Sequence, residues 1–203
     1  MKKRYSKIIL ALLCLTLALS FAACGNDKDK EEPASEPIEE PVEESLAVSD
    51  YDVQLYFANL EYIETGDETF PALVGPFDYI LNDIEDGSQY YALLEAMKSA
   101  EDYQDAYTTL VPQRVVNSVQ VEGGVAYVDF ASPLDGSALD ESLMINQIVT
   151  ALTESFSEIE KVQFTLDGEV VDTLMGHIAV DEPFTRAEAE NLELQADEGD
   201  GDA

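Results

Sequence analysis

Apolar residues with the regular spacing of strands and helices are confined to residues 51–186, between two segments dominated by acids. Residues 25–50 contain ten acids, two lysines and three prolines, which is typical of a solvated, extended linker. Residues 187–203 contain seven acids, which predicts a short helix near Arg186–Leu194 followed by a largely disordered acidic tail. One domain of about 136 residues is therefore expected between the two.

Acidity sets limits on the partners of this chain. Its 203 residues carry 43 Asp and Glu against 10 Lys and Arg, a formal net charge of -33. Residues 51–186 alone hold 26 acids and 4 bases. Nucleic acid is excluded as a partner because its binding requires cations that displace phosphate counterions. No glycine-rich phosphate-binding motif is present, so nucleotide binding has no support. No cofactor of another kind is expected either.

The N-terminus predicts export and lipidation. A basic head, Lys2–Lys7, precedes an apolar stretch that is too short for a transmembrane helix. Ala22-Ala23-Cys24 then resembles a bacterial lipobox, which makes residues 1–23 a lipoprotein signal peptide and Cys24 the lipidated first residue of the mature chain. In this interpretation residues 24–50 tether the domain to the outer face of the cell membrane. An ordinary secretory signal with an incidental cysteine is the alternative.

The apolar patterns predict the elements of the domain. Strands are expected at 52–58, 115–121, 124–130, 161–166 and 169–174, and helices at 88–100 and 140–156. Asp140 is the expected cap of the second helix, with Ser137 as its rival. Residues 59–87 can form either an edge strand or an irregular loop. The order β-α-β-β-α-β-β favours an α+β fold, a mixed or antiparallel sheet with both helices on one face.

Six segments of the chain form a recognisable set, namely VQLYFAN (53–59), GGVAYVDF (123–130), NQIVTALT (146–153), VQFTLDG (162–168), TLMGHI (173–178) and EPFTR (182–186). Together they resemble the GerMN-domain family, named for the sporulation and spore germination protein GerM. The resemblance implies a single GerMN-like domain at 51–186 in a lipid-anchored envelope protein rather than an enzyme, with a possible role in sporulation or germination. Asp129, Gly176 and His177 lie in these segments, as structural or interaction residues.

The chemistry that the residues could support is narrow. His177 is the only histidine, and no nucleophile motif accompanies it, so a structural hydrogen bond is its expected role. Asp129 is expected on the less apolar face of its strand, solvated or hydrogen-bonded. One histidine and no free thiol in the mature chain argue against a zinc centre. The acid-dense segments 83–87 and 197–202 could attract calcium weakly and diffusely, so that the cation screens their charge.

These observations favour a non-catalytic module that contacts other envelope proteins through exposed sheet edges or helix faces, with self-association opposed by its own charge. Two alternatives remain open. One is a cell-wall hydrolase that uses paired carboxylates, and the other is a lipoprotein that binds a cation or a solute.

Overall fold

The computed structural model describes residues 47–192. The predicted signal peptide, the lipidated Cys24, the linker up to residue 46 and the tail after Leu192 lie outside the described residues. The elements in chain order are β1 (Val48–Asn59), α2 (Leu60–Thr65), β2 (Leu73–Glu85), α3 (Gln89–Ala96), β3 (Ala106–Tyr107), β4 (Val116–Glu122), β5 (Val125–Phe130), α4 (Ala138–Ser155), β6 (Lys161–Leu166) and α5 (Arg186–Glu190).

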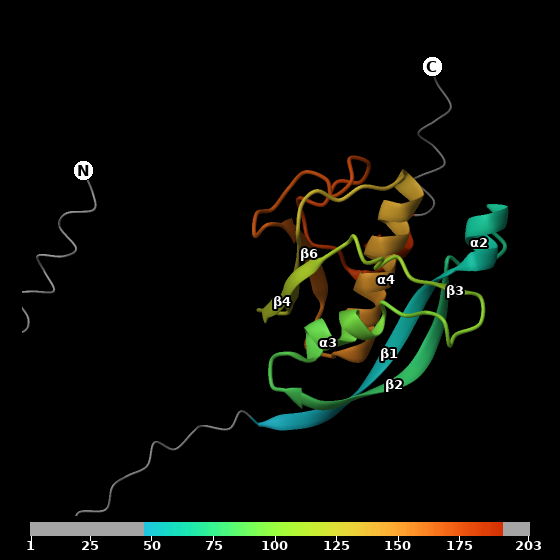
Figure 1. Ribbon diagram of the computed structural model, residues 1–203. Helices are drawn as coiled ribbons and strands as arrows, with labels where there is room; N and C mark the ends of the chain where they lie inside the picture. Colours follow the sequence, from blue (N-terminus) through green and yellow to red (C-terminus); the bar gives the residue numbers. More distant parts are fainter. Residues whose placement is uncertain (1–46, 193–203) are drawn as a thin grey trace, which may run out of the picture. The chain divides into compact units, whose positions relative to one another are not determined.

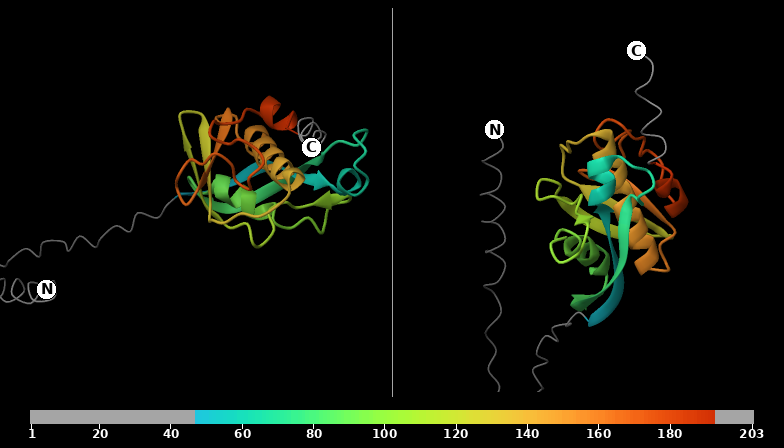
Figure 2. Two further views of the ribbon diagram at one scale, coloured as in Figure 1. Left: turned by 90° about the horizontal axis from the view of Figure 1, so that it is seen from above. Right: turned by 90° about the vertical axis from the view of Figure 1, so that its right-hand side faces the viewer.

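The strands form two three-stranded sheets, and the fold is α+β as predicted. The first sheet has the order β2-β1-β3 and is antiparallel. The second has the order β4-β5-β6, with β4 antiparallel and β6 parallel to β5. The sequence predicts one sheet with its helices on one face, whereas the structure has two sheets and runs α4 through the centre of the domain (Figures 1 and 2).

Helix α4 explains why two sheets are needed. Every residue from Glu141 to Leu152 is buried, so the helix requires cover on all sides rather than along one stripe. Its cap is Ser137, and not Asp140 as first expected. The Ser137 hydroxyl accepts the backbone N–H of Asp140 at 3.1 Å, and the Asp140 carboxylate accepts the backbone N–H of Ser137 at 3.0 Å. This reciprocal capping box places the acid in the first turn, where the helix dipole favours it.

Of the two predicted hairpins, the first forms and the second does not. β4 and β5 pair across a Gly123-Gly124 turn, and β6 has its predicted bounds. Asp167 and Gly168 form the predicted turn, with φ of 50° and 83°. The strand predicted at 169–174 is wrong, because the chain returns to β6 only through an isolated bridge at Glu169. Phe184 pairs with Val162 instead, through an isolated bridge of two backbone hydrogen bonds on the outer edge of β6.

The segment that the sequence leaves open, 59–87, contains α2 and the long edge strand β2. α3 ends at Ala96, short of the predicted Ala100, and the Thr108 hydroxyl donates to the carbonyl of Met97 at 2.6 Å just beyond it. α5 begins after its cap Thr185. The core includes Leu192, so the described fold continues past residue 186, where the predicted domain ends.

Candidate functional site

Asp129 on β5 holds the turn that follows β6. Its Oδ1 accepts from the Thr165 hydroxyl and from the Gly168 backbone N–H, both at 2.7 Å. Its Oδ2 accepts from the Asn117 amide at 2.9 Å. Partial burial works to raise the pKa of the carboxyl, but hydrogen bonds from Thr165, Asn117 and Gly168 outweigh it and lower the pKa. The carboxylate therefore stays ionised and ties β4, β5 and the Asp167-Gly168 turn together.

Gly176 and His177 lie on the segment after that turn, and this segment is held by a residue that the sequence analysis missed. Glu141 in α4 is completely buried. Its Oε1 accepts the backbone N–H groups of Leu174 and Met175, both at 2.9 Å. Its Oε2 accepts those of His177 at 2.9 Å and Ile178 at 3.2 Å. One carboxylate thus satisfies four backbone donors that no strand partner satisfies.

The sequence carries a signal for this role. Glu141 precedes Ile145 by four residues and Ile148 by seven, so it falls on the apolar stripe of the helix. A lone acid at that spacing indicates a buried carboxylate, and a buried carboxylate requires donors.

Gly136 packs tightly where this segment meets the start of α4. A Cβ atom there would lie 2.5 Å from the Met175 sulfur and 2.9 Å from Nη2 of Arg114. The Gly136 carbonyl oxygen lies 3.2 Å from Nε2 of His177. Arg114, only 7% exposed, donates to the Thr109 carbonyl at 2.8 Å and lies 3.7 Å from the Asp140 carboxylate. Burial works to raise the pKa of Asp140, but hydrogen bonds at Ser137 and the charge of Arg114 lower it.

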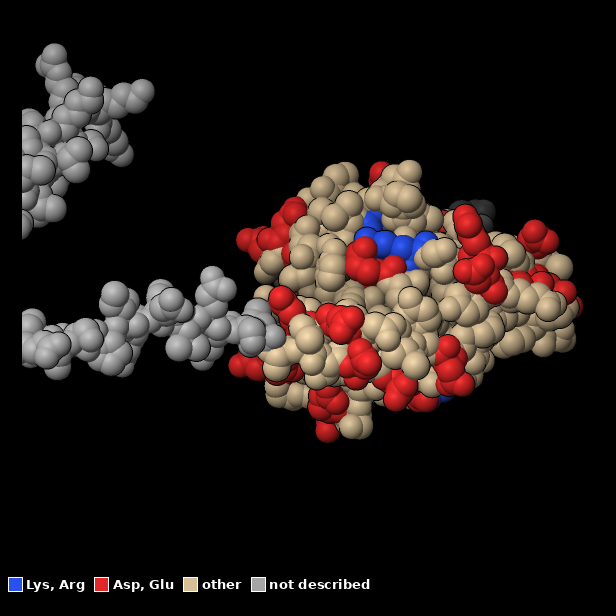
Figure 3. All heavy atoms as spheres, turned by 60° about the horizontal axis from the view of Figure 1, so that its bottom comes forward, with Lys and Arg blue, Asp and Glu red and all other residues tan. Residues whose placement is uncertain are grey.

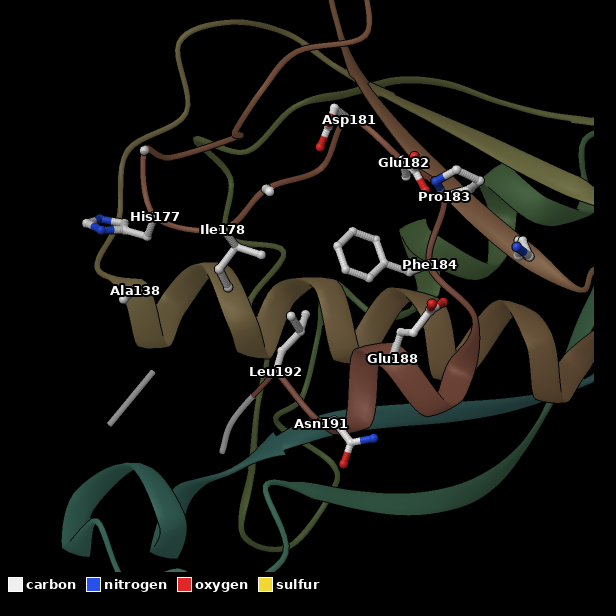
Figure 4. A pocket seen from close by; sticks show the side chains of 13 residues that line it. Ala138, His177, Ile178, Asp181, Glu182, Pro183, Phe184, Glu188, Asn191 and Leu192 are labelled. Atoms are coloured by element: carbon white, nitrogen blue, oxygen red, sulfur yellow. The ribbon is translucent and has the colours of Figure 1, made fainter. Parts of the chain in front are cut away.

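The segment 176–184 forms one wall of an open groove of about 1170 Å³. α5 and the residues after it form the opposite side, and the first residue of α4 also lines it. Figure 4 shows Ile178, Phe184 and Leu192 directed toward one another above α4, with Asp181 and Glu182 beyond them. His177 points away from this apolar centre. The groove therefore has an apolar floor and a charged rim on which the acids Asp181, Glu182 and Glu188 outnumber the one lining lysine, Lys161. This combination is suited to contact with a surface that is partly apolar and mainly cationic.

The three predicted site residues are not brought together into one reactive centre. Asp129 serves the β6 turn, whereas Gly176 and His177 belong to the segment that Glu141 holds. Between residues 47 and 192, no group of three potential metal ligands lies close enough to hold an ion. The acid-dense segment 197–202 lies outside the described residues. No helix of the described chain has the length and apolar character to span a bilayer.

The fold defines a small α+β domain of the GerMN type. The first GerMN domain of the sporulation protein GerM from Bacillus subtilis superposes with a TM-score of 0.50 at 18% identity, covering 67% of this chain and 98% of that one. The tandem GerMN domains of the same protein give 0.49 at 16%, covering 69% and 47%. A candidate lipoprotein from Clostridium perfringens gives 0.45 at 20%, covering 68% and 89%. No curated protein matches the chain.

The sequence assigns the family. A sequence model of the family Germane, described as sporulation and spore germination, matches residues 54–172. This match spans more than half of the chain, so the protein belongs to the Germane family, and the resemblance to GerMN domains noted in its sequence is confirmed.

Proposed function

We propose that this protein is a lipid-anchored module on the outer face of the cell membrane that works by non-catalytic contact with other envelope proteins. A role in sporulation or germination is the context that the family description supports. The observation that carries the proposal is that some acids of the domain bind its own backbone while others line an open groove. Asp129 and Glu141 bind the chain's own turns, while Asp181 and Glu182 line an open groove beside apolar residues.

The bonding of the two inner carboxylates favours contact over catalysis. A general acid or base needs an oxygen that can reach a substrate proton. Both oxygens of Glu141 accept two backbone N–H groups each, in a site with no exposure. Asp129 accepts three hydrogen bonds from within the domain. Freeing either group for chemistry would release a turn of the fold, at a cost of several hydrogen bonds.

The anchor rests on Cys24, and a matched pair of cysteine variants tests it. Cys24→Ser in the full chain should move the protein from the membrane fraction to the soluble exported fraction and abolish incorporation of labelled palmitate. Cys14→Ser changes a cysteine within the predicted signal peptide and should alter neither. A Cys24→Ser protein that remains lipidated would contradict the anchor.

Incubation with peptidoglycan tests the hydrolase alternative. The purified full chain should release no soluble fragments. If fragments are released, and if one folded Asp or Glu variant abolishes that release, a carboxylate-dependent hydrolase would replace the contact proposal.

The alternative of a cation-binding lipoprotein is tested by calorimetric titration with calcium, and saturable binding with a defined stoichiometry would support it.

A further inference from the structure

We propose that the free edge of β2 from Phe77 to Asn82 binds an extended, lysine- or arginine-bearing segment of another envelope protein by strand addition. The proposal adds a second surface to the contact function proposed above. This second surface is separate from the groove. β2 belongs to the first sheet, whereas Lys161, which lines the groove, begins β6 in the second sheet.

The edge is open along the described chain. β2 is the outer strand of its sheet and pairs only with β1. The described backbone hydrogen bonds outside the sheet ladders include none from residues 77–82. An edge strand in this state presents alternate N–H and C=O groups to an incoming strand. The Asn82 side chain donates to the Ile80 carbonyl at 3.2 Å, a bond within β2 itself.

Two features limit the length of the docking edge. Pro76 has no backbone N–H, so it cannot donate to an added strand. Asp83 has a φ of 55° and donates its N–H to the Asp50 carboxylate at 2.9 Å, which interrupts the regular extended backbone within β2. The stretch between them matches the length of an ordinary short strand.

The side chains of the edge give a partner apolar contacts. Tyr79 is 41% exposed and Ile80 is 52% exposed. They are consecutive residues of a strand and lie on opposite faces of the sheet. The side chains of an added strand would therefore contact apolar residues on both faces of the sheet. Cross-strand pairs of this kind stabilise sheets.

The negative charge of β2 indicates which kind of strand would bind at its edge. β2 carries Asp78, Asp83 and Glu85 and no cation. Acidic side chains are spread over the face that Figure 3 shows, with few cationic groups among them. Three of the four described cations already form ion pairs within the chain, namely Lys98, Arg114 and Arg186. A second copy would bring further acids to an edge that is already acidic, whereas a cationic strand brings charges that are scarce on this surface.

Peptide titration of the purified full chain tests the proposal. The probe is a ten-residue peptide of alternating Thr and Lys, compared with its Thr/Glu counterpart and with a Thr/Lys peptide that is N-methylated on alternate amides. The Thr/Lys peptide should bind and protect from hydrogen exchange those amides of residues 77–82 that face away from β1. The N-methylated peptide keeps the charge but cannot form the ladder, so its affinity should fall by about tenfold or more. The Thr/Glu peptide should not bind.

Matched variants separate the edge from general attraction. Asp78→Lys should weaken binding of the Thr/Lys peptide by about tenfold, because like charges would then face each other on the strand. Glu68→Lys makes the same change on an exposed loop residue and should weaken it by about twofold at most. Glu182→Lys on the groove rim should behave like Glu68→Lys, so the edge and the groove can fail separately.

Three outcomes would overturn the proposal. The first is equal binding of the N-methylated peptide, and the second is equal loss in all three folded variants, since both indicate diffuse electrostatic attraction. The third is a dimer in sedimentation without peptide that Asp78→Lys alters, because the occupant of the edge would then be a second copy.

Discussion

The Glu141 carboxylate of α4 accepts the backbone N–H of His177 at 2.9 Å, across 36 residues of chain. Three further backbone donors from the same segment reach the same carboxylate. The helix thus supplies one acceptor group for a segment that has no strand partner. This relationship places the groove wall relative to the central helix.

Replacing Glu141 should destabilise the whole domain. In Glu141→Gln the amide nitrogen cannot accept, so two buried N–H groups lose their partner. We expect the free energy of unfolding to fall by about 3 kcal/mol, since hydrogen bonds to charged groups are worth roughly 1.5–3 kcal/mol each. Urea unfolding followed by circular dichroism measures this. Glu68→Gln makes the same chemical change on the surface and should cost less than about 0.5 kcal/mol. Equal stability of the two variants would show that the carboxylate does not hold the segment.

Asp129 should make stability depend on acid pH. Its pKa in the folded chain is lowered, so its stabilisation is fully present above the ordinary unfolded value of 3.8 and is lost as the pH falls through the depressed folded value. We expect Asp129→Asn to reduce the free energy of unfolding by about 1 kcal/mol at neutral pH. The gap from the parent chain should close progressively as the pH falls below about 4.

Unfolding curves at a series of pH values measure that gap. Asp86→Asn removes an exposed acid as a control and should follow the parent chain throughout. A gap that widens on acidification would have the wrong sign for a depressed pKa and would refute the assignment.

Gly136 should accept a side chain only if the ends of the Met175 and Arg114 side chains move. Gly136→Ala places a methyl group 2.5 Å from the Met175 sulfur, and overpacking of this kind costs about 1–3 kcal/mol. Met175→Ala in the same chain should recover part of that loss, because it removes the nearest atom. A double-mutant cycle of unfolding free energies measures the coupling. Additive effects of the two substitutions would mean that the contact does not exist.

Salt should stabilise the domain. With 26 acids and 4 bases in residues 51–186, self-repulsion opposes the compact state, and salt screens it. Raising sodium chloride from about 0.02 M to about 0.5 M should raise the thermal midpoint by several degrees. Glu68→Lys lowers the repulsion, so its midpoint should rise less over the same range. A midpoint that falls with salt would indicate that the ion pairs outweigh the repulsion.

The parts of the fold that sequence pattern predicts are those set by local periodicity. The β4–β5 hairpin, β6 and α4 have alternating or helical spacing and local turn or cap residues, so their approximate bounds follow from the chain itself. The false strand at 169–174 has the right composition but the wrong environment, because Phe184 pairs with β6 at Val162 and Glu141 binds the backbone from Leu174 onward. Both competitors are distant in sequence.

The site was harder to predict for the same reason. The resemblance points to Asp129, Gly176 and His177, yet Glu141, which binds the backbone of His177 and of the residues around Gly176, lies far earlier in the chain. Sequence pattern leaves β2 open between an edge strand and an irregular loop, because its residues do not alternate strictly between buried and exposed. Its pairing with β1 makes it a strand. Long-range pairing of this kind leaves little local trace in sequence.

Contact at the groove is the central claim, and photocrosslinking in intact cells tests it most directly. A photoreactive residue at position 182 of the full, lipidated chain should give a discrete adduct with an envelope protein, and the same residue at position 68 should not. Combining the 182 probe with Phe184→Ala should weaken that adduct, because the apolar floor would be lost. The same adducts from both positions, or none from position 182 at any growth stage, would contradict it.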